Sequence, residues 1–260
     1  MIVTAPVTVI PYIELRAITL GPIWIPVFSL LGLVALGSGM LRGVWRAREK
    51  GVWHLMRGTF VLWIVAGGLT GAVLLKLVYY PYLFESQPLA EVFRFRGISS
   101  FGGVFGGLLG LYLNLARRGV PAREMVRVLD VAAYVVPFSW AIGRLGCALV
   151  HDHPGIRSDS WLAVRYPDWP RYDLGLLGML FLILLGTFFR LLDRRPRPDG
   201  FFVVLACIFV GVFRFWMDRL QVDTPRYYGW SVDQINALLL LSLGLVFLPF
   251  LRNSGSEEAL

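Results

Sequence analysis

The chain has 260 residues, of which 57% are hydrophobic and only 16% carry a charged side chain. Soluble globular domains have a charged fraction of roughly 25%, so this composition excludes a soluble protein and indicates an integral membrane protein. The net charge of +8 is compatible with nucleic-acid binding, but the basic residues lie mainly in short loops, which explains the charge without such a partner.

Seven apolar segments have about the length of roughly 20 residues that a membrane-spanning helix needs. They cover residues 21–41, 58–82, 99–116, 128–148, 174–192, 200–220 and 234–251. A span with its connection uses roughly 30 to 40 residues, so seven spans fill the chain. We therefore expect an all-α integral membrane protein with about seven transmembrane helices in a single multi-pass domain, residues 1–260.

The basic residues between these segments indicate an orientation in the membrane. Most of them lie in the loops after the first, third and fifth segments, and fewer lie in the longer loops on the opposite side. Lysine and arginine near the ends of spanning helices are retained on the cytoplasmic side. We therefore expect the amino terminus outside and the carboxyl terminus in the cytoplasm, and we predict no nucleic-acid partner.

Glycines recur at four-residue spacing in the third segment, as Gly102, Gly106 and Gly110. This spacing places them on one helix face, which lets a second helix approach closely. The alternative is a close approach of the backbone to a lipid headgroup. Under that alternative Gly102 and the adjacent Gly103 are candidates for substrate binding.

Two arginines lie near the outer ends of spanning segments, Arg144 in the fourth and Arg214 in the sixth, and Lys76 lies at a similar depth in the second. Asp218 follows Arg214 by four residues and so shares its helix face. Ionisable side chains at membrane depth are costly and need a partner or a function. One alternative is internal salt bridges, chiefly between Arg214 and Asp218. The other is an anion site in which two guanidinium groups bind a phosphodiester.

The tripeptide His151, Asp152, His153 directly follows the fourth segment, on the same outer side. A histidine oriented by a carboxylate is suited to general acid or base work near neutral pH, and a plain surface loop is the alternative. Consecutive residues rarely chelate one ion together, so we predict no metal site. Cys147, just before the tripeptide, is interpreted as a small packing residue.

The segment GRLGCALVHDHPG, from Gly143 to Gly155, resembles the signature of the prolipoprotein diacylglyceryl transferase family, written GRxGNFxNxExxG. Gly143, Arg144, Gly146 and Gly155 match it. Arg214 with Asp218 resembles the late Arg-x-x-x-Glu pair of that family, and RGISSFGGVFGG lies where the family has a Ser-Phe-His-Gly-Gly run.

The chain departs from the family pattern at several positions. Cys147 and Val150 stand where the signature has asparagines, Asp152 stands for its glutamate, and Phe101 stands for the histidine before the double glycine. Because that histidine is implicated in proton handling, we expect His151 or His153 to take over its role. The alternative is a chain that has kept the lipid cavity and lost catalysis.

The resemblance implies an enzyme of the bacterial inner membrane with its active site towards the outer leaflet. The family transfers a diacylglyceryl group from phosphatidylglycerol to the lipobox cysteine thiol of a prolipoprotein, without a cofactor. His151, Asp152 and His153 are the catalytic candidates because of their acid–base chemistry and their position beside the predicted cations. The substrate-binding candidates are Arg144, Arg214, Asp218, Gly102, Gly103 and Gly155.

Two other classes of protein are alternatives to this interpretation. A non-catalytic relative that binds phospholipid or lipoprotein is the first alternative, favoured by Phe101 and Cys147. A transporter or photoreceptor is the second. It is disfavoured because no duplicated halves are visible and because the seventh segment has no lysine for a retinal Schiff base.

Overall fold

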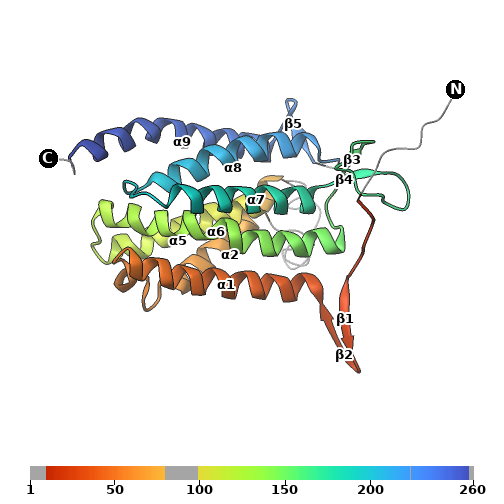
Figure 1. Cartoon of the computed structure of the whole chain (residues 1–260), viewed down its shortest axis with the longest axis horizontal. Helices are drawn as coiled ribbons and strands as arrows, with labels where there is room; N and C mark the ends of the chain where they lie inside the picture. The colour runs from red at the N-terminus through yellow and green to blue at the C-terminus, as the bar shows by residue number, and fades with distance from the viewer. Residues whose placement is uncertain (1–9, 80–98, 223, 258–260) are drawn as a thin grey trace. The chain divides into compact units, whose positions relative to one another are not determined.

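The computed structural model describes residues 10–79, 99–222 and 224–257, and this part of the chain forms seven α-helices (Figure 1). The helices are α1 (Val27–Glu49), α2 (Phe60–Tyr79), α5 (Ser100–Arg117), α6 (Ala122–Val150), α7 (Leu174–Leu192), α8 (Phe201–Arg219) and α9 (Val232–Glu257), with a short 3-10 helix η1 (Trp53–Met56). Six short strands pair as antiparallel hairpins: β1 (Ala17–Leu20) with β2 (Ile23–Pro26), β3 (Pro154–Arg157) with β4 (Arg171–Asp173), and β5 (Arg226–Tyr227) with β6 (Trp230–Ser231).

The helical fold of an integral membrane protein is confirmed. Every helix of the described part except α5 is long and apolar enough to cross a membrane, judged by length and composition. In α5 the glycines, with Asn114 and Arg117, lower the hydropathy, although the helix is 18 residues long. The orientation of the termini stays a prediction.

The predicted helix boundaries agree best where capping signals flank the apolar run. The segment 174–192 matches α7 at both ends, because the Asp173 side chain accepts a hydrogen bond from the Leu176 N–H and so caps the helix. Residues 80–82 of the second predicted segment lie outside the described residues. The predicted start at 128 was wrong, since α6 begins at Ala122, where the Pro121 carbonyl accepts the first helical bonds.

The first predicted helix, 21–41, was also wrong at both ends. Its opening residues form the β1–β2 hairpin, where Gly21 turns the chain with a φ of +61° and Pro22 and Pro26 limit helical hydrogen bonding. At the other end α1 continues to Glu49. Arginine, alanine and glutamate favour a helix. Basic residues such as Arg46, which follow the predicted segment 21–41 and were therefore expected in a loop, lie on the last turns of α1.

The chain divides into two compact units. One comprises residues 1–43, 132–197 and 212–224, and the other comprises residues 44–131, 198–211 and 225–260. The prediction of a single multi-pass domain stays a prediction.

In the first unit α6 packs between α1 and α7, as Figure 1 shows. A methyl group built on Gly146 of α6 would contact the Phe28 Cα of α1 at 3.4 Å. On the other side, a methyl group on Gly175 of α7 would lie 2.7 Å from the Ala148 backbone nitrogen of α6. No side chain fits between these two backbones, so Gly175 sets how closely α7 approaches the end of α6.

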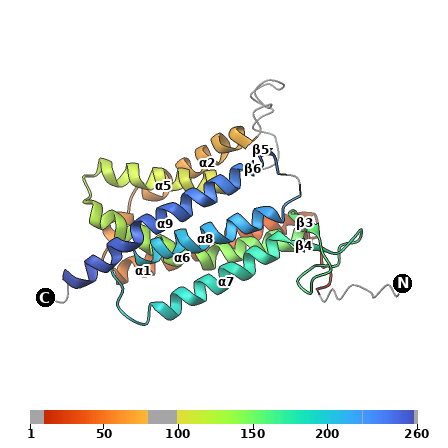
Figure 2. The same ribbon diagram turned by 90° about the horizontal axis from the view of Figure 1, so that it is seen from above.

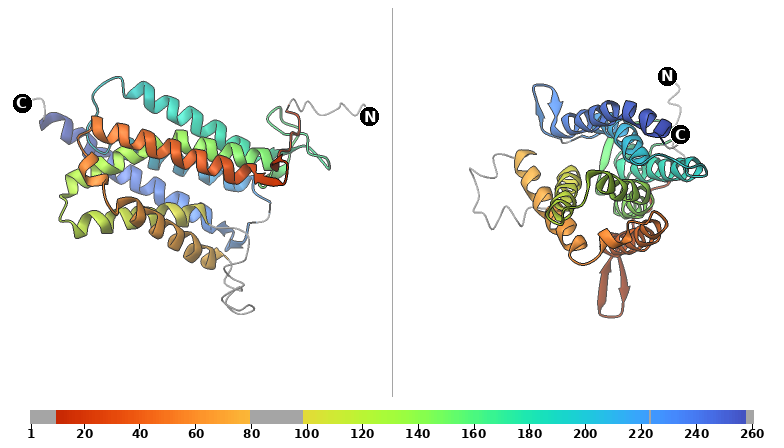
Figure 3. Two further views of the ribbon diagram at one scale, coloured as in Figure 1. Left: turned by 90° about the horizontal axis from the view of Figure 1, so that it is seen from below. Right: turned by 90° about the vertical axis from the view of Figure 1, so that its left-hand side faces the viewer.

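In the second unit α2 and α5 pack antiparallel through glycines, and the two helices lie side by side in Figure 2 and Figure 3. A methyl group on Gly106 would lie 2.1 Å from the Gly67 carbonyl oxygen, and one on Gly102 would lie 2.3 Å from the Gly71 carbonyl oxygen. The glycine spacing read from the sequence therefore serves helix packing here. By contrast, a methyl group on Gly103 would make only ordinary contacts, at 3.9 Å.

The close approach of α2 and α5 predicts a position-specific effect of substitution. Gly106→Ala should lower the free energy of unfolding by about 1–3 kcal/mol, because the new methyl group meets backbone that has to move. Gly107→Ala is the matched control, since its methyl group would lie 3.6 Å from its neighbours. Thermal unfolding of the detergent-solubilised variants measures the difference, and equal midpoints for the two variants would contradict the packing role.

Candidate functional site

The predicted site residues of the first unit gather at the carboxyl end of α6. There α6, α7 and the end of α8 meet the β3–β4 hairpin, as Figure 2 shows. The Ile156 N–H donates to the Leu220 carbonyl at 2.8 Å. A methyl group on Gly155 would lie 2.9 Å from the carbonyl oxygens of both Leu220 and Tyr172. Gly155 is thus needed for backbone packing at this junction.

Arg144 is the most deeply placed cation of this site. It lies on α6 and is only 9% exposed. Its side chain runs across Gly178 of α7, where an added methyl group would lie 3.4 Å from the arginine Cδ. Its guanidinium carbon lies 5.8 Å from the centre of the Trp140 ring, within cation–π range.

The charge of Arg144 acts on several neighbours. It interacts electrostatically with Arg214 and Asp152, and its side chain hydrogen-bonds the Cys147 thiol. The structure therefore brings Arg144 and Arg214 into range of each other's charge, although they come from different helices, α6 and α8. Asp218, one turn beyond Arg214 on α8, is buried.

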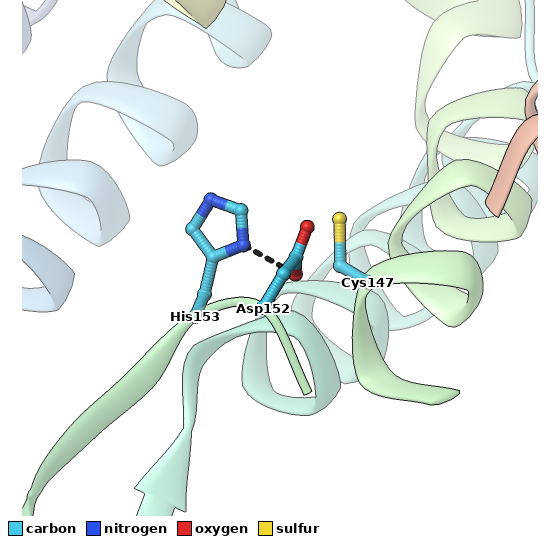
Figure 4. A group of neighbouring side chains, drawn as sticks. All are labelled: Cys147, Asp152 and His153. Atoms are coloured by element: carbon cyan, nitrogen blue, oxygen red, sulfur yellow. Dashed lines mark hydrogen bonds and ion pairs between the residues drawn. The ribbon is translucent and has the colours of Figure 1, made fainter. Parts of the chain in front are cut away.

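His153 and Asp152 form a pair beside Cys147, drawn in Figure 4. The Nδ1 atom of His153 lies 2.5 Å from the Asp152 Oδ1 atom, and the two side chains are 42% and 36% exposed. Hydrogen bonds with Asp152 and then with Cys147 raise the pKa of His153 to about 9. His153 is therefore protonated at neutral pH and holds its proton more firmly than an unperturbed histidine.

His151 has a different environment from His153. Its ring stacks on Tyr12 with the centres 4.1 Å apart and meets Tyr166 edge-on at 5.2 Å. Nδ1 lies 2.6 Å from an Asp173 carboxylate oxygen and Nε2 lies 3.2 Å from the Ile13 carbonyl, and the side chain is 6% exposed. Because both ring nitrogens are engaged, this geometry favours a structural role for His151.

Asp173 also belongs to this region, although it is not among the residues predicted from the sequence. One oxygen caps α7, and the other accepts a 2.8 Å hydrogen bond from the Tyr166 hydroxyl in addition to its contact with His151. Burial and the bond to Asp173 raise the pKa of Tyr166. An aspartate directly before an apolar run is a helix-start signal, but its link to His151 spans 22 residues of sequence.

A sequence profile described as prolipoprotein diacylglyceryl transferase matches residues 16–250. The chain belongs to this family. Relatives named phosphatidylglycerol–prolipoprotein diacylglyceryl transferase include that of Nitratidesulfovibrio vulgaris, 28% identical over 95% of this chain and 97% of its own length. That of Bordetella avium is 30% identical over 95% and 98%, and that of Pseudomonas aeruginosa is 25% identical over 96% and 98%. The resemblance is confirmed over nearly the whole chain.

Part of the transferase family pattern lies in the second unit. Phe101, which stands for the family histidine, is buried and stacks on Phe105 with the ring centres 5.8 Å apart. The Ser99 hydroxyl caps α5 by accepting a hydrogen bond from the Gly102 N–H at 3.0 Å. Lys76 is also buried in this unit, on α2. An apolar ring thus occupies the position at which the family has an imidazole.

The contacts of His151 predict a stability effect. His151→Asn should lower the free energy of unfolding by about 1–3 kcal/mol, because buried partners lose their hydrogen bonds. Asparagine tolerates the left-handed backbone that His151 adopts, with a φ of 51°. His54→Asn is the control, since His54 is 63% exposed and should change stability by less than about 0.5 kcal/mol. Similar unfolding midpoints for both variants would argue against the structural role.

Proposed function

We propose that this chain is a phosphatidylglycerol–prolipoprotein diacylglyceryl transferase. It transfers the diacylglyceryl group of phosphatidylglycerol to the lipobox cysteine thiol of a prolipoprotein. The shared family and the names of relatives that align with about 95% of the chain support this proposal. The distribution of loop charges supports a site that faces the outer leaflet of the bacterial inner membrane.

The observation that carries the proposal is the buried Arg144 within range of the charge of Arg214. Two like charges in a poorly solvated site repel each other, and an anion that binds both offsets this repulsion. The phosphodiester of phosphatidylglycerol is a singly charged anion at headgroup depth. Guanidinium groups match the oxygen geometry of a phosphate through paired N–H bonds.

The proposed reaction forms a thioether and breaks a carbon–oxygen bond. The thiol sulfur attacks the glyceryl carbon of the lipid, the bond from that carbon to the phosphate oxygen breaks, and glycerol phosphate leaves with the bonding electron pair. The thiol proton passes to a general base, for which His151 and His153 are the predicted candidates, and is then released to water. Negative charge grows on the departing phosphate, and fixed cations at Arg144 and Arg214 stabilise it. We propose that Asp218 orients Arg214.

The other predicted residues divide into two groups. Gly102 in the second unit and Gly155 in the first each meet neighbouring backbone too closely for a side chain, and substrate binding by either stays a prediction. The catalytic assignment of His151, Asp152 and His153 stays a prediction, as does substrate binding by Gly103. Of the two imidazoles, that of His153 is the more exposed, with 42% of its side chain accessible against 6% for His151.

The phosphate role of Arg144 is tested by turnover. Arg144→Ala should lower thiol-dependent release of glycerol phosphate by about 10²–10³-fold, the loss typical when one charge-stabilising donor is removed. Arg157→Ala is the control, because Arg157 is an exposed arginine at the same end of the first unit. The assay uses purified protein in vesicles of labelled phosphatidylglycerol with a lipobox peptide, and a peptide carrying serine for cysteine sets the background.

Two results would contradict the proposal. Undiminished turnover in the folded Arg144→Ala variant would remove the phosphate role from this residue. Wild-type protein that binds phosphatidylglycerol without releasing glycerol phosphate would support the non-catalytic alternative instead.

A further inference from the structure

Contrary to the prediction from the sequence, which considered only the tripeptide, we propose that Cys147, Asp152 and His153 form a binding site for a divalent transition-metal ion of the zinc class. Each residue offers one ligand atom, and these atoms all lie within 4.8 Å of one another. Figure 4 shows the three side chains converging at the end of α6. This site goes beyond the transferase reaction, which requires no metal.

The donor set fits zinc in chemistry and in charge. Zinc binds cysteine sulfur, histidine nitrogen and aspartate oxygen, and its open sites use three protein ligands with water in the fourth position. A sulfur and an imidazole donor favour zinc and its neighbours over magnesium or calcium, which prefer oxygen ligands. Binding of the ion displaces the protons of the Cys147 thiol and of His153 into water. The resulting thiolate and the Asp152 carboxylate together carry two negative charges, which balance a divalent ion.

The fold explains why residues five and six positions apart converge. Cys147 lies in the last turn of α6, which ends at Val150. His151 then adopts a left-handed backbone, with a φ of 51°, and such a residue after a helix reverses the chain. The reversal brings Asp152 and His153 back towards the turn that carries Cys147. The contacts of His151 with Tyr12, Tyr166 and Asp173 hold this turn in place.

The ligand atoms need only a small adjustment to bind one ion. Two ligands of a tetrahedral zinc ion lie roughly 3.4 Å apart, given metal–ligand distances near 2.1 Å. His153 Nδ1 and Asp152 Oδ1 are closer than this, at 2.5 Å, and have to separate. Both side chains are partly exposed, so rotation about their side-chain bonds achieves the separation without moving the backbone. The same exposure gives an ion access from water.

Direct binding measurements on the full chain test the site. Chelator-stripped protein, purified in detergent without lipid substrate or peptide, is titrated with Zn²⁺ against a competing chelator. We expect one ion per chain. Loading with Co²⁺ should produce the near-ultraviolet charge-transfer band of a cobalt–thiolate bond, which reports a sulfur ligand directly. Because no transfer reaction is measured, the result is independent of whether the proposed transferase activity is found.

Two variants and one control make the result specific. Cys147→Asn removes the sulfur and places there the residue that the family signature carries, so the fold should tolerate it; His153→Ala removes the nitrogen. Loss of a residue that only hydrogen-bonds a metal ligand weakens metal binding by roughly 10–100-fold, and loss of a ligand should weaken Zn²⁺ binding by at least as much. Cys147→Asn should also abolish the Co²⁺ band. Cys207→Ser changes the only other cysteine of the chain and should leave both readouts unchanged.

Three results would overturn the proposal. They are wild-type protein without stoichiometric Zn²⁺, undiminished affinity in Cys147→Asn and His153→Ala, and a Co²⁺ spectrum that lacks the thiolate band.

Discussion

Arg144 carries a positive charge on a helix apolar enough to span a membrane, and it is almost fully buried. Removing an ion from water costs several kcal/mol even after the protein relaxes, so the surroundings must stabilise this charge. The structure supplies an aromatic face from Trp140, the Cys147 thiol and the field of Asp152. It also brings the second cation, Arg214, into range of the charge of Arg144, and the proposed anion site rests on this pair.

The position of Arg144 depends on two glycines of α7 and on the contacts that hold the end of α6. Gly175 lets α7 contact the backbone of α6, and Gly178 leaves the space that the arginine side chain fills. His151 holds the turn after α6 through Asp173, and the Leu15 N–H bonds the Leu149 carbonyl at 2.8 Å. Rigid support of this kind is what fixes a charged group where charge develops in a reaction.

The helix bounds predicted from the sequence were wrong where an apolar run contains prolines or continues into residues that also favour a helix. Helix α7 was placed correctly because a capping aspartate and an uninterrupted apolar run agree. Helix α1 was misplaced because apolarity alone does not distinguish the β1–β2 hairpin from the helix that follows it, and the two prolines decide between them. The strands escaped detection because each has four residues or fewer, which is too short for an alternating pattern.

The sequence by itself determined the membrane class, the apolar helices, the family and the residue types of the proposed anion site, because hydrophobic length and charged residues within apolar segments are local properties. Only the tertiary structure decided which of these residues meet. His151 is buried and supports the turn after α6, whereas His153 is partly exposed and pairs with Asp152. The fold also brings Cys147 close to His153. Such contacts depend on how a helix ends and which backbones touch, and neither periodicity nor composition encodes them.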